Sequence, residues 1–280
     1  MFIEVNTQVK VDDLLKGMII QSGNDASIAL AEHVAGSESA FADLMNNTAQ
    51  KLGMHGSHFE NVTGLTGEQH YMTARDIATL SQAIIRDFPD DYKRYSIKEY
   101  TYNNITQQNR NKLLWRDPSV DGLKTGHTDA AKYCLASSAK RDDMRLISAV
   151  MGAPSVDART TNSQALLNYG FRFYESSRLY TAQQELITKR VWYGEEKEVK
   201  LGVKEDVVVT IPRGRYNDLE PFLEVASLIE APLQKNQVVG KVTVKLGDEV
   251  YKQIDLVALH DVEEGSIIRK LVDFVLSYFE

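Results

Sequence analysis

Two short clusters of polar residues could take part in chemistry. The first, Ser-Gly-Asn at 22–24, lies in a polar break between two segments whose apolar residues have helical spacing. The second, Lys-Thr-Gly-His-Thr at 124–128, lies on a predicted strand. A serine hydroxyl is a weak nucleophile that needs a neighbouring base, and a lysine ammonium favours negatively charged groups. Taken alone, each cluster is equally well explained as an ordinary turn, because three-residue patterns recur by chance.

Taken together, in this order and at this separation, the clusters match the second and third motifs of the set S-x-x-K, S-D-N and K-T-G. Further matching segments are Asn109–Asn111, Val120–Thr128, Met144–Gly152, Gly170–Phe173, Thr210–Arg215 and Ala231–Gly240. The chain therefore resembles the low-molecular-mass, class C penicillin-binding proteins, which are serine-type D-alanyl-D-alanine carboxypeptidases. A β-lactamase is the less favoured alternative, because Ser-Gly-Asn replaces Ser-Asp-Asn and because β-lactamases lack the β-rich second half.

The resemblance implies acyl transfer on peptidoglycan pentapeptides. A serine attacks the carbonyl between two D-alanines, the terminal D-alanine leaves, and water releases the acyl-enzyme. β-Lactam antibiotics are expected to bind covalently wherever the nucleophilic serine of the family is present. The resemblance implies neither a metal ion nor another cofactor.

By the same resemblance, Ser22 and Lys124 are catalytic residues on opposite sides of a cleft. Ser22 relays a proton toward the leaving amine, and Lys124 supplies positive potential that favours a carboxylate. The implied substrate-binding residues are Asn24, Thr125, Gly126, His127, Arg159 and Arg110. In this set, Asn24 holds the peptide backbone and the backbone N–H of His127 forms half of an oxyanion hole. Thr125 and Arg159 meet the terminal carboxylate, with a contribution from Arg110. Without the resemblance, Arg159 would be interpreted as an exposed charge on a helix.

The S-x-x-K motif, which carries the nucleophile and its base in this family, should precede Ser-Gly-Asn by several dozen residues. Only 21 residues precede Ser22. We therefore expect an N-terminally truncated chain that is inactive alone. Its first domain should be loosely packed, with apolar residues such as Met18, Ile19 and Leu30 facing a void or water. The alternative function is that of a non-catalytic fragment that binds cell-wall peptide or membrane.

One S-x-x-K string does occur, at Ser137–Lys140. Residues three apart lie side by side on a helix, but they point to opposite faces of a strand. This string runs off a predicted strand into a turn. It is therefore rejected as the site of the nucleophile.

The first part of the chain has the pattern of a mixed domain of helices and strands. Helices are predicted over Val11–Gln21, Ala26–Val34, Ser37–Leu52, from a cap at Thr73 to Asp87, and over Asp157–Tyr174. Extended segments are predicted over Glu99–Asn103 and Asp121–Thr128, and a hairpin over Tyr133–Ala139 and Met144–Gly152 with its turn at Lys140–Asp143. The predicted fold class is an α/β (α+β) transpeptidase or β-lactamase-like catalytic domain over residues 1–177, incomplete at its N-terminus.

The remainder of the chain changes character. Short β-rich runs predict a small all-β domain over residues 178–262: Leu186–Trp192, Val207–Pro212, Leu223–Ile229, Val238–Leu246 and Val250–Leu259. Residues 263–280 have the pattern of an amphipathic helix, with Asp273 among the polar residues opposite the apolar face. Such a helix either lies in a membrane interface or docks on its own domain.

Charge and hydropathy limit the partners and the location. The net charge of −7 argues against a nucleic-acid binder, and no run of about twenty apolar residues could span a membrane. The first residues lack the pattern of a signal peptide. The resemblance implies a peripheral protein on the periplasmic face of the inner membrane, held there by the C-terminal helix and exported by an upstream signal peptide.

Overall fold

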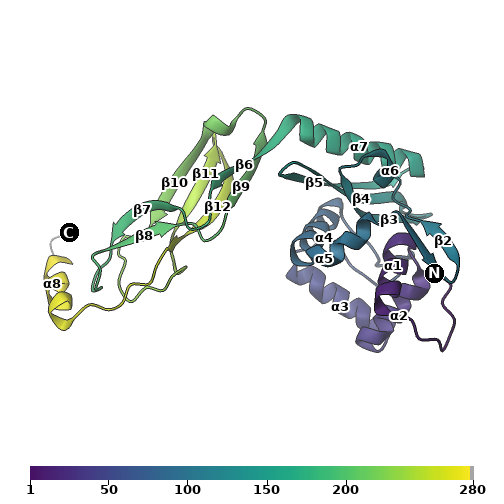
Figure 1. Ribbon diagram of the computed structural model, residues 1–280, viewed down its shortest axis with the longest axis horizontal. Helices are drawn as coiled ribbons and strands as arrows, with labels where there is room; N and C mark the ends of the chain where they lie inside the picture. The colour runs from purple at the N-terminus through teal and green to yellow at the C-terminus, as the bar shows by residue number, and fades with distance from the viewer. Residues whose placement is uncertain (278–280) are drawn as a thin grey trace. The chain divides into compact units, whose positions relative to one another are not determined.

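The computed structural model describes residues 1–277, and the chain divides into two compact units, Met1–Arg172 and Phe173–Glu280. The first unit combines helices with a small antiparallel sheet, and the second is built mainly of strands (Figure 1). The predicted fold class, a mixed catalytic domain followed by an all-β domain and a terminal helix, agrees with this order of elements. The sequence predicted the boundary after residue 177, which lies within the first strand of the second unit.

Local signals in the sequence account for the helices of the first unit. They are α1 (Val11–Gln21), α2 (Asn24–Ala35), α3 (Glu38–Lys51), α4 (Ala74–Asp87), α5 (Pro89–Tyr92), α6 (Leu113–Arg116), α7 (Val156–Phe173) and the 3-10 turn η1 (Lys93–Ser96). The Thr73 hydroxyl accepts from the backbone N–H of Asp76, so the predicted cap of α4 is confirmed. Pro89 begins α5 directly after α4, as expected for a residue that cannot continue a helix but suits its first turn.

A three-stranded antiparallel sheet forms the framework of the first unit. Its strands are β3 (Val120–Thr128), β4 (Lys132–Arg141) and β5 (Met144–Ala153) in the order β3-β4-β5, while β1 (Glu99–Tyr102) and β2 (Ile105–Gln108) form a separate hairpin. The predicted hairpin is confirmed, but its strands continue further than predicted and only Asp142 and Asp143 form the turn. Helix α7 lies along one face of this sheet and α4 along the other (Figure 1).

The structure corrects the expected packing of the first unit at two places. Ile19 is buried and does not face water, and Met18 and Leu30 are half-buried against a small cluster formed by Met1, Leu14 and Ala26. On α7, Leu166 lies at helical spacing with Tyr169 and Phe173, yet its side chain is exposed. The positions of α7 that pack inward include polar residues. The packed face of α7 is therefore not the face that its apolar spacing indicates.

The second unit contains a five-stranded antiparallel sheet with the order β10-β11-β12-β8-β7 and a two-stranded sheet of β6 and β9. The strands are β6 (Tyr174–Tyr180), β7 (Glu185–Arg190), β8 (Glu198–Gly202), β9 (Val207–Pro212), β10 (Leu219–Val225), β11 (Val238–Leu246) and β12 (Glu249–Ala258), with the 3-10 turn η2 (Tyr216–Asp218) before β10. Buried valines and leucines of the five-stranded sheet and its connecting segments form one core, against which Leu179 and Tyr180 of β6 pack. The prediction missed β6 and β8 and placed β10 too late in the chain.

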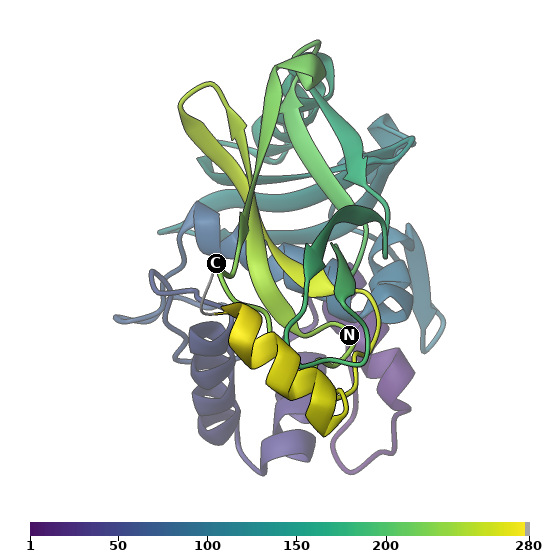
Figure 2. The same ribbon diagram turned by 90° about the vertical axis from the view of Figure 1, so that its left-hand side faces the viewer.

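The C-terminal helix α8 (Ile267–Ser277) belongs to the second unit and lies beyond the ends of β7 and β8 (Figure 2). The predicted helix is therefore present, although residues 278–280 of the predicted segment lie outside the described residues. Among residues 1–277, no helix is long and apolar enough to cross a bilayer.

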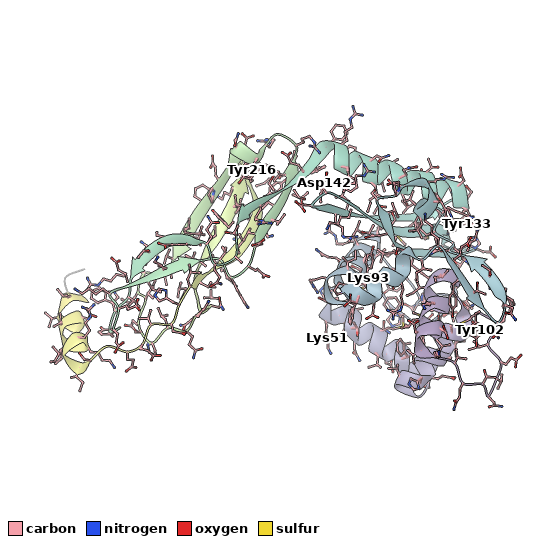
Figure 3. The ribbon with its side chains drawn as sticks, in the orientation of Figure 1. Lys51, Lys93, Tyr102, Tyr133, Asp142 and Tyr216 are labelled. Atoms are coloured by element: carbon pink, nitrogen blue, oxygen red, sulfur yellow. The ribbon has the colours of Figure 1, made fainter. Side chains whose placement is uncertain are left out.

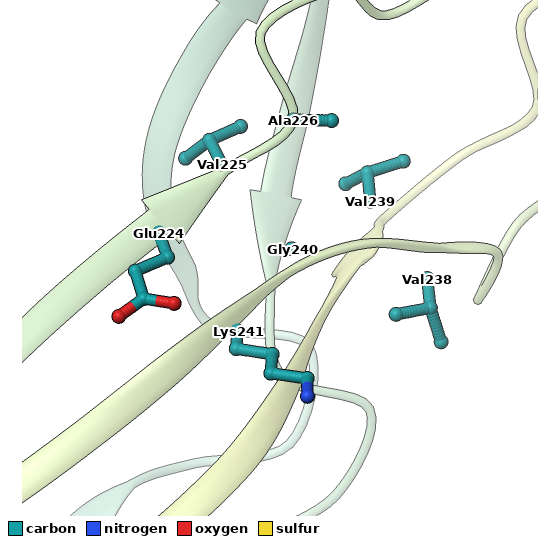
Figure 4. A pocket seen from close by; sticks show the side chains of 7 residues that line it. All are labelled: Glu224, Val225, Ala226, Val238, Val239, Gly240 and Lys241. Atoms are coloured by element: carbon teal, nitrogen blue, oxygen red, sulfur yellow. The ribbon is translucent and has the colours of Figure 1, made fainter.

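An open hollow of about 420 Å³ lies where β10 and β11 meet (Figure 4). Valine and alanine side chains and the backbone of Gly240 line it, with Glu224 and Lys241 as its charged residues. It lies in the second unit and contains none of the residues that the sequence predicted to be functional.

Candidate active site

Ser22 and Lys124 are joined directly although 102 positions separate them in the chain. The Nζ of Lys124 donates a hydrogen bond to the Ser22 hydroxyl, and it also donates to the carbonyl oxygen of Thr125 at 3.0 Å. Ser22 ends α1 in the left-handed backbone region, with φ 56°, and Gly23 caps the start of α2. Non-glycine residues adopt this conformation rarely, and it is typical of functional positions that the surrounding structure holds in place.

The Lys124 amine lies in an environment that disfavours its charge. Burial is the first cause, and the positive charges of Arg110 and Arg159 add to it, so the pKa of Lys124 falls to about 8. At neutral pH the side chain is therefore a cation close to the point at which it can give up a proton. Such a group can hold an anion and can also exchange a proton with the Ser22 hydroxyl.

We expect the unfolding free energy to vary with pH as Lys124 titrates. The folded pKa lies below the ordinary value of 10.5, so between about pH 8 and 10.5 the unfolded chain binds more protons than the folded chain. In this window, Lys124 therefore makes the unfolding free energy rise with pH; below it, both states hold the proton and the penalty for burying the charge is fully present. Urea unfolding of the wild type and Lys124→Met across pH 7–11 checks this. Parallel curves for the two proteins would contradict it.

Asn24 and the end of β3 provide groups on either side of this pair. Asn24 is exposed at the first position of α2, and its amide makes no hydrogen bond with any residue that the structure describes. Thr125 is buried, whereas Gly126 and His127 are exposed. Because β3 pairs only with β4 in the described chain, its other edge leaves backbone groups open beside Lys124.

Arg159 is the residue for which the sequence alone gave a wrong expectation. It is 4% exposed, not an exposed helical charge, and burial lowers the pKa of its guanidinium. Its Nη1 donates to the carbonyls of Gly126 at 3.0 Å and Cys134 at 3.2 Å, and its Nη2 donates to the carbonyl of Arg110 at 3.5 Å. Its Nε is buried without a hydrogen-bond partner among the described residues. The guanidinium is thus fixed by backbone oxygens and keeps donor capacity for an anion.

The remaining predicted residue, Arg110, joins the two sides of the site. Its backbone N–H donates to the carbonyl of Ile20 at 3.4 Å, next to the Ser-Gly-Asn segment, and its own carbonyl accepts from Arg159. Its side chain is exposed. The structure therefore brings Ser22, Lys124 and Arg159 into one neighbourhood through contacts of their own or of adjacent residues.

Sequence reasoning missed the residues that hold the start of β3, just before Lys124. The buried side chain of Asn111 donates to the carbonyl of Gly122 at 3.0 Å and accepts from the N–H of Leu113 at 3.1 Å. Arg145 binds both carboxylate oxygens of Asp121, at 2.8 and 2.7 Å. An arginine within an otherwise apolar strand was the available signal, because such a charge needs a partner.

Tyr133 is a second residue that sequence reasoning missed (Figure 3). It is paired with His127 across β3 and β4, and the two ring centroids lie 4.1 Å apart. The guanidinium of Arg159 lies 5.6 Å from the centroid of the Tyr133 ring. The ring therefore lies close to two residues of the predicted substrate site.

The alternative S-x-x-K string has the geometry of a strand. Ser137 and Lys140 both lie in β4, which continues to Arg141, so Lys140 is not yet in the turn. Ser137 is completely buried and its hydroxyl is hydrogen-bonded to that of Ser148 at 2.7 Å, whereas Lys140 is exposed. This geometry supports its rejection as the site of the nucleophile. Among residues 1–277, no three His, Cys, Asp or Glu side chains lie together in a way that could hold a metal ion.

Comparison with known proteins gives consistent matches for both units. Residues 1–155 match the family described as D-alanyl-D-alanine carboxypeptidase, and residues 174–264 match the C-terminal domain of penicillin-binding protein 5. The chain is 44% identical to the D-alanyl-D-alanine carboxypeptidase DacA of Escherichia coli K12, covering 100% of this chain and 70% of that protein. The crystal structure of penicillin-binding protein 5 from Haemophilus influenzae superposes with a TM-score of 0.87 at 43% identity, covering 94% of this chain and 78% of that one.

Proposed function

Because the chain belongs to the D-alanyl-D-alanine carboxypeptidase family, a family of serine hydrolases, we propose that Ser22 and Lys124 lie in its acyl-transfer site. The reaction of the family removes the terminal D-alanine of peptidoglycan pentapeptides and is the reaction that penicillins intercept. The observation that carries the assignment is the hydrogen bond from Lys124 to Ser22, which unites the two motifs. A β-lactamase is not favoured, because the second unit matches a penicillin-binding protein domain.

Within this site, each group has a role that follows from its chemistry. The Ser22 hydroxyl passes a proton between the reacting serine of the family and the leaving amine, while Lys124 holds it in place. The exposed amide of Asn24 pairs with the peptide backbone of the substrate. The N–H of His127, at the open end of β3 after Gly126, donates to the oxyanion that forms as the carbonyl is attacked.

The terminal carboxylate of the substrate is the group that Arg159 recognises in this proposal. The N–H of its Nη2 that the Arg110 carbonyl leaves open can donate to a carboxylate oxygen. Thr125 adds a hydroxyl, and the exposed side chain of Arg110 adds positive charge that guides the anion. Backbone carbonyls already fix the guanidinium, so little side-chain freedom is lost when the substrate binds.

We therefore expect binding to depend on the charge of the ligand terminus. N-acetyl-D-alanyl-D-alanine should bind about tenfold or more tightly than its C-terminal amide, since charged hydrogen bonds contribute roughly 1.5–3 kcal/mol. NMR titration of the amide signals of Gly126 and His127 measures both affinities. Arg159→Lys should remove most of the difference, and Arg116→Lys, a change at an exposed arginine on α6, should preserve it. Equal affinities of acid and amide for the wild type would refute the carboxylate site.

We also propose that α8 holds the protein on the surface of a phospholipid bilayer, at the periplasmic face of the inner membrane where pentapeptides are found. The apolar residues of α8 are exposed, with Ile267 at 80% and Leu271 at 61%. A helix with one apolar face and one charged face lies in the plane of the membrane interface with the apolar face inserted.

Removal of Gly265–Glu280 should release the protein from vesicles of phosphatidylethanolamine and phosphatidylglycerol. The double change Ile268→Ser and Leu271→Ser should weaken cosedimentation by about tenfold or more, because each buried aliphatic side chain contributes roughly 1.5–3 kcal/mol. Sedimentation assays over a range of lipid concentrations give the partition coefficients. If the shortened protein sediments like the full chain, the bilayer contact lies elsewhere.

A further inference from the structure

The carboxylate of Asp273 lies at the centre of the contact between α8 and the strands of its own unit. Its residue is 0% exposed, although the sequence placed it on the polar face of an amphipathic helix. It accepts the backbone N–H of Tyr193 at 2.9 Å and Nη2 of Arg190 at 3.3 Å, and Nε of Arg269 lies 3.2 Å away. A buried carboxylate is tolerated only when such partners compensate for the lost water, so this contact is specific.

The chain that leads into α8 is attached to the same segment. Gly265 donates its N–H to the carbonyl of Tyr193 at 2.7 Å, and Glu195 donates to the carbonyl of Glu263 at 3.0 Å. A Cβ at Gly265 would lie 2.7 Å from the carbonyl oxygen of Gly194, so only glycine allows this close approach. Backbone pairing thus fixes the start of α8, and Asp273 fixes its middle.

Arg190 is itself held in position before it reaches Asp273. Its guanidinium lies 3.7 Å from the centroid of the Trp192 ring, and Trp192 is buried. A guanidinium stacked on an aromatic ring has fewer rotamers to lose when it pairs with a carboxylate. The Arg190 guanidinium and the backbone N–H of Tyr193 therefore form a prearranged socket for Asp273, and Arg269 adds a positive charge from α8 itself.

Helix α8 packs on its domain with its polar face, whereas most surface helices pack with their apolar face. A surface helix normally turns its apolar stripe toward the core of its domain and its charged side chains toward water. In α8, the buried residue is the aspartate, while the aliphatic residues on the other side, among them Ile267, Ile268 and Leu271, remain exposed. Burial of apolar surface does not explain this docking, but the carboxylate and its socket do.

We infer that Asp273 is a clasp that keeps α8 folded on its domain and turns its apolar face outward toward the hydrocarbon boundary of a bilayer. The inference rests on the membrane association proposed above, and it adds that the helix is formed before it meets lipid. A helix of 11 residues is marginal in water by itself, so without the clasp it must fold as it binds. The clasp also gives the β-rich unit a fixed orientation relative to the helix that enters the interface.

Asp273→Asn tests the clasp, because an amide of nearly the same shape lacks the charge and turns an N–H group toward the donors of the socket. Hydrogen exchange without lipid should show the backbone of α8 protected in the wild type, with protection reduced by about a hundredfold in the variant. Protection of β11 should be unchanged, which shows that the unit remains folded. Lys270→Ala, on the same helix, breaks only the exposed pair with Glu264 and should preserve the protection of α8.

Vesicle binding distinguishes the proposed role of Asp273 from the proposal that α8 associates with a membrane. With phosphatidylethanolamine and phosphatidylglycerol vesicles, Asp273→Asn should bind about tenfold more weakly, because the freed helix must order itself on the surface. Equal protection of α8 in the wild type and the variant, or binding of the variant as tight as that of the wild type, would overturn the inference. A wild type that shows a protected α8 lost in the variant, yet binds no vesicles, supports the clasp and refutes the membrane association alone.

Discussion

A fluorescent penicillin is expected to leave the 280-residue chain without a covalent label. The only S-x-x-K string in these residues is Ser137–Lys140. Ser137 has no exposed surface and is hydrogen-bonded to Ser148, and Lys140 lies on the opposite face of β4. A buried hydroxyl with no base within reach cannot attack a β-lactam ring. Gel fluorescence after a long incubation measures this, with a serine penicillin-binding protein that carries the complete motif set as the positive control.

The substitutions Ser137→Ala and Ser22→Ala identify the reacting serine if a labelled band does appear. A band that disappears in Ser137→Ala would show that the strand opens and that its serine reacts. A band that survives this change but disappears in Ser22→Ala would make Ser22 the nucleophile instead of the proton relay. Either band would contradict the roles proposed here, whereas an unlabelled chain that still binds D-alanyl-D-alanine ligands agrees with a binding site in which Ser22 is not the nucleophile.

Asn111→Ala is expected to cause a large loss of stability in the first unit. The substitution leaves the carbonyl of Gly122 and the N–H of Leu113 buried without their partners, and each such group costs about 1–3 kcal/mol. We therefore expect the unfolding free energy to fall by about 3 kcal/mol, measured by urea unfolding followed by tyrosine and tryptophan signals. Because Gly122 leads into Lys124, affinity for D-alanyl-D-alanine ligands should also decrease.

Asn162→Ala provides the matched control for this experiment. Asn162 is exposed on α7, so its truncation should change the unfolding free energy by less than about 0.5 kcal/mol. If Asn111→Ala were as mild as this control, the side chain of Asn111 would not be what holds the start of β3.

The elements that sequence reasoning predicted well are those whose signals are local. The bounds of α1, β9 and β11 agree with the prediction because apolar spacing and flanking turns define them within a few residues. The strand β6 was missed because its partner in the described chain is β9, some thirty positions later, and no pattern in its own residues indicates that pairing.

The candidate site likewise contains residues that local motifs identified and residues that the sequence alone misjudged. The motifs identified Ser22 and Lys124, and the structure places them in contact. Whether a charged residue on a helix is buried depends on which face of the helix packs, and this is decided by distant segments. For this reason the sequence alone misjudged Arg159 on α7 and Asp273 on α8, two helical charges whose partners lie on strands or on the segments next to them.

The Arg159 guanidinium connects two neighbouring strands beside the candidate site. Its Nη1 bridges Gly126 and Cys134, which face each other on β3 and β4, so this side chain closes the end of that ladder. Fraying of a strand end is among the least costly openings of a folded protein. Were this end to open, Arg159 and the His127 amide would lose their positions in one event, so the carboxylate recognition and the oxyanion stabilisation proposed for them would be lost together.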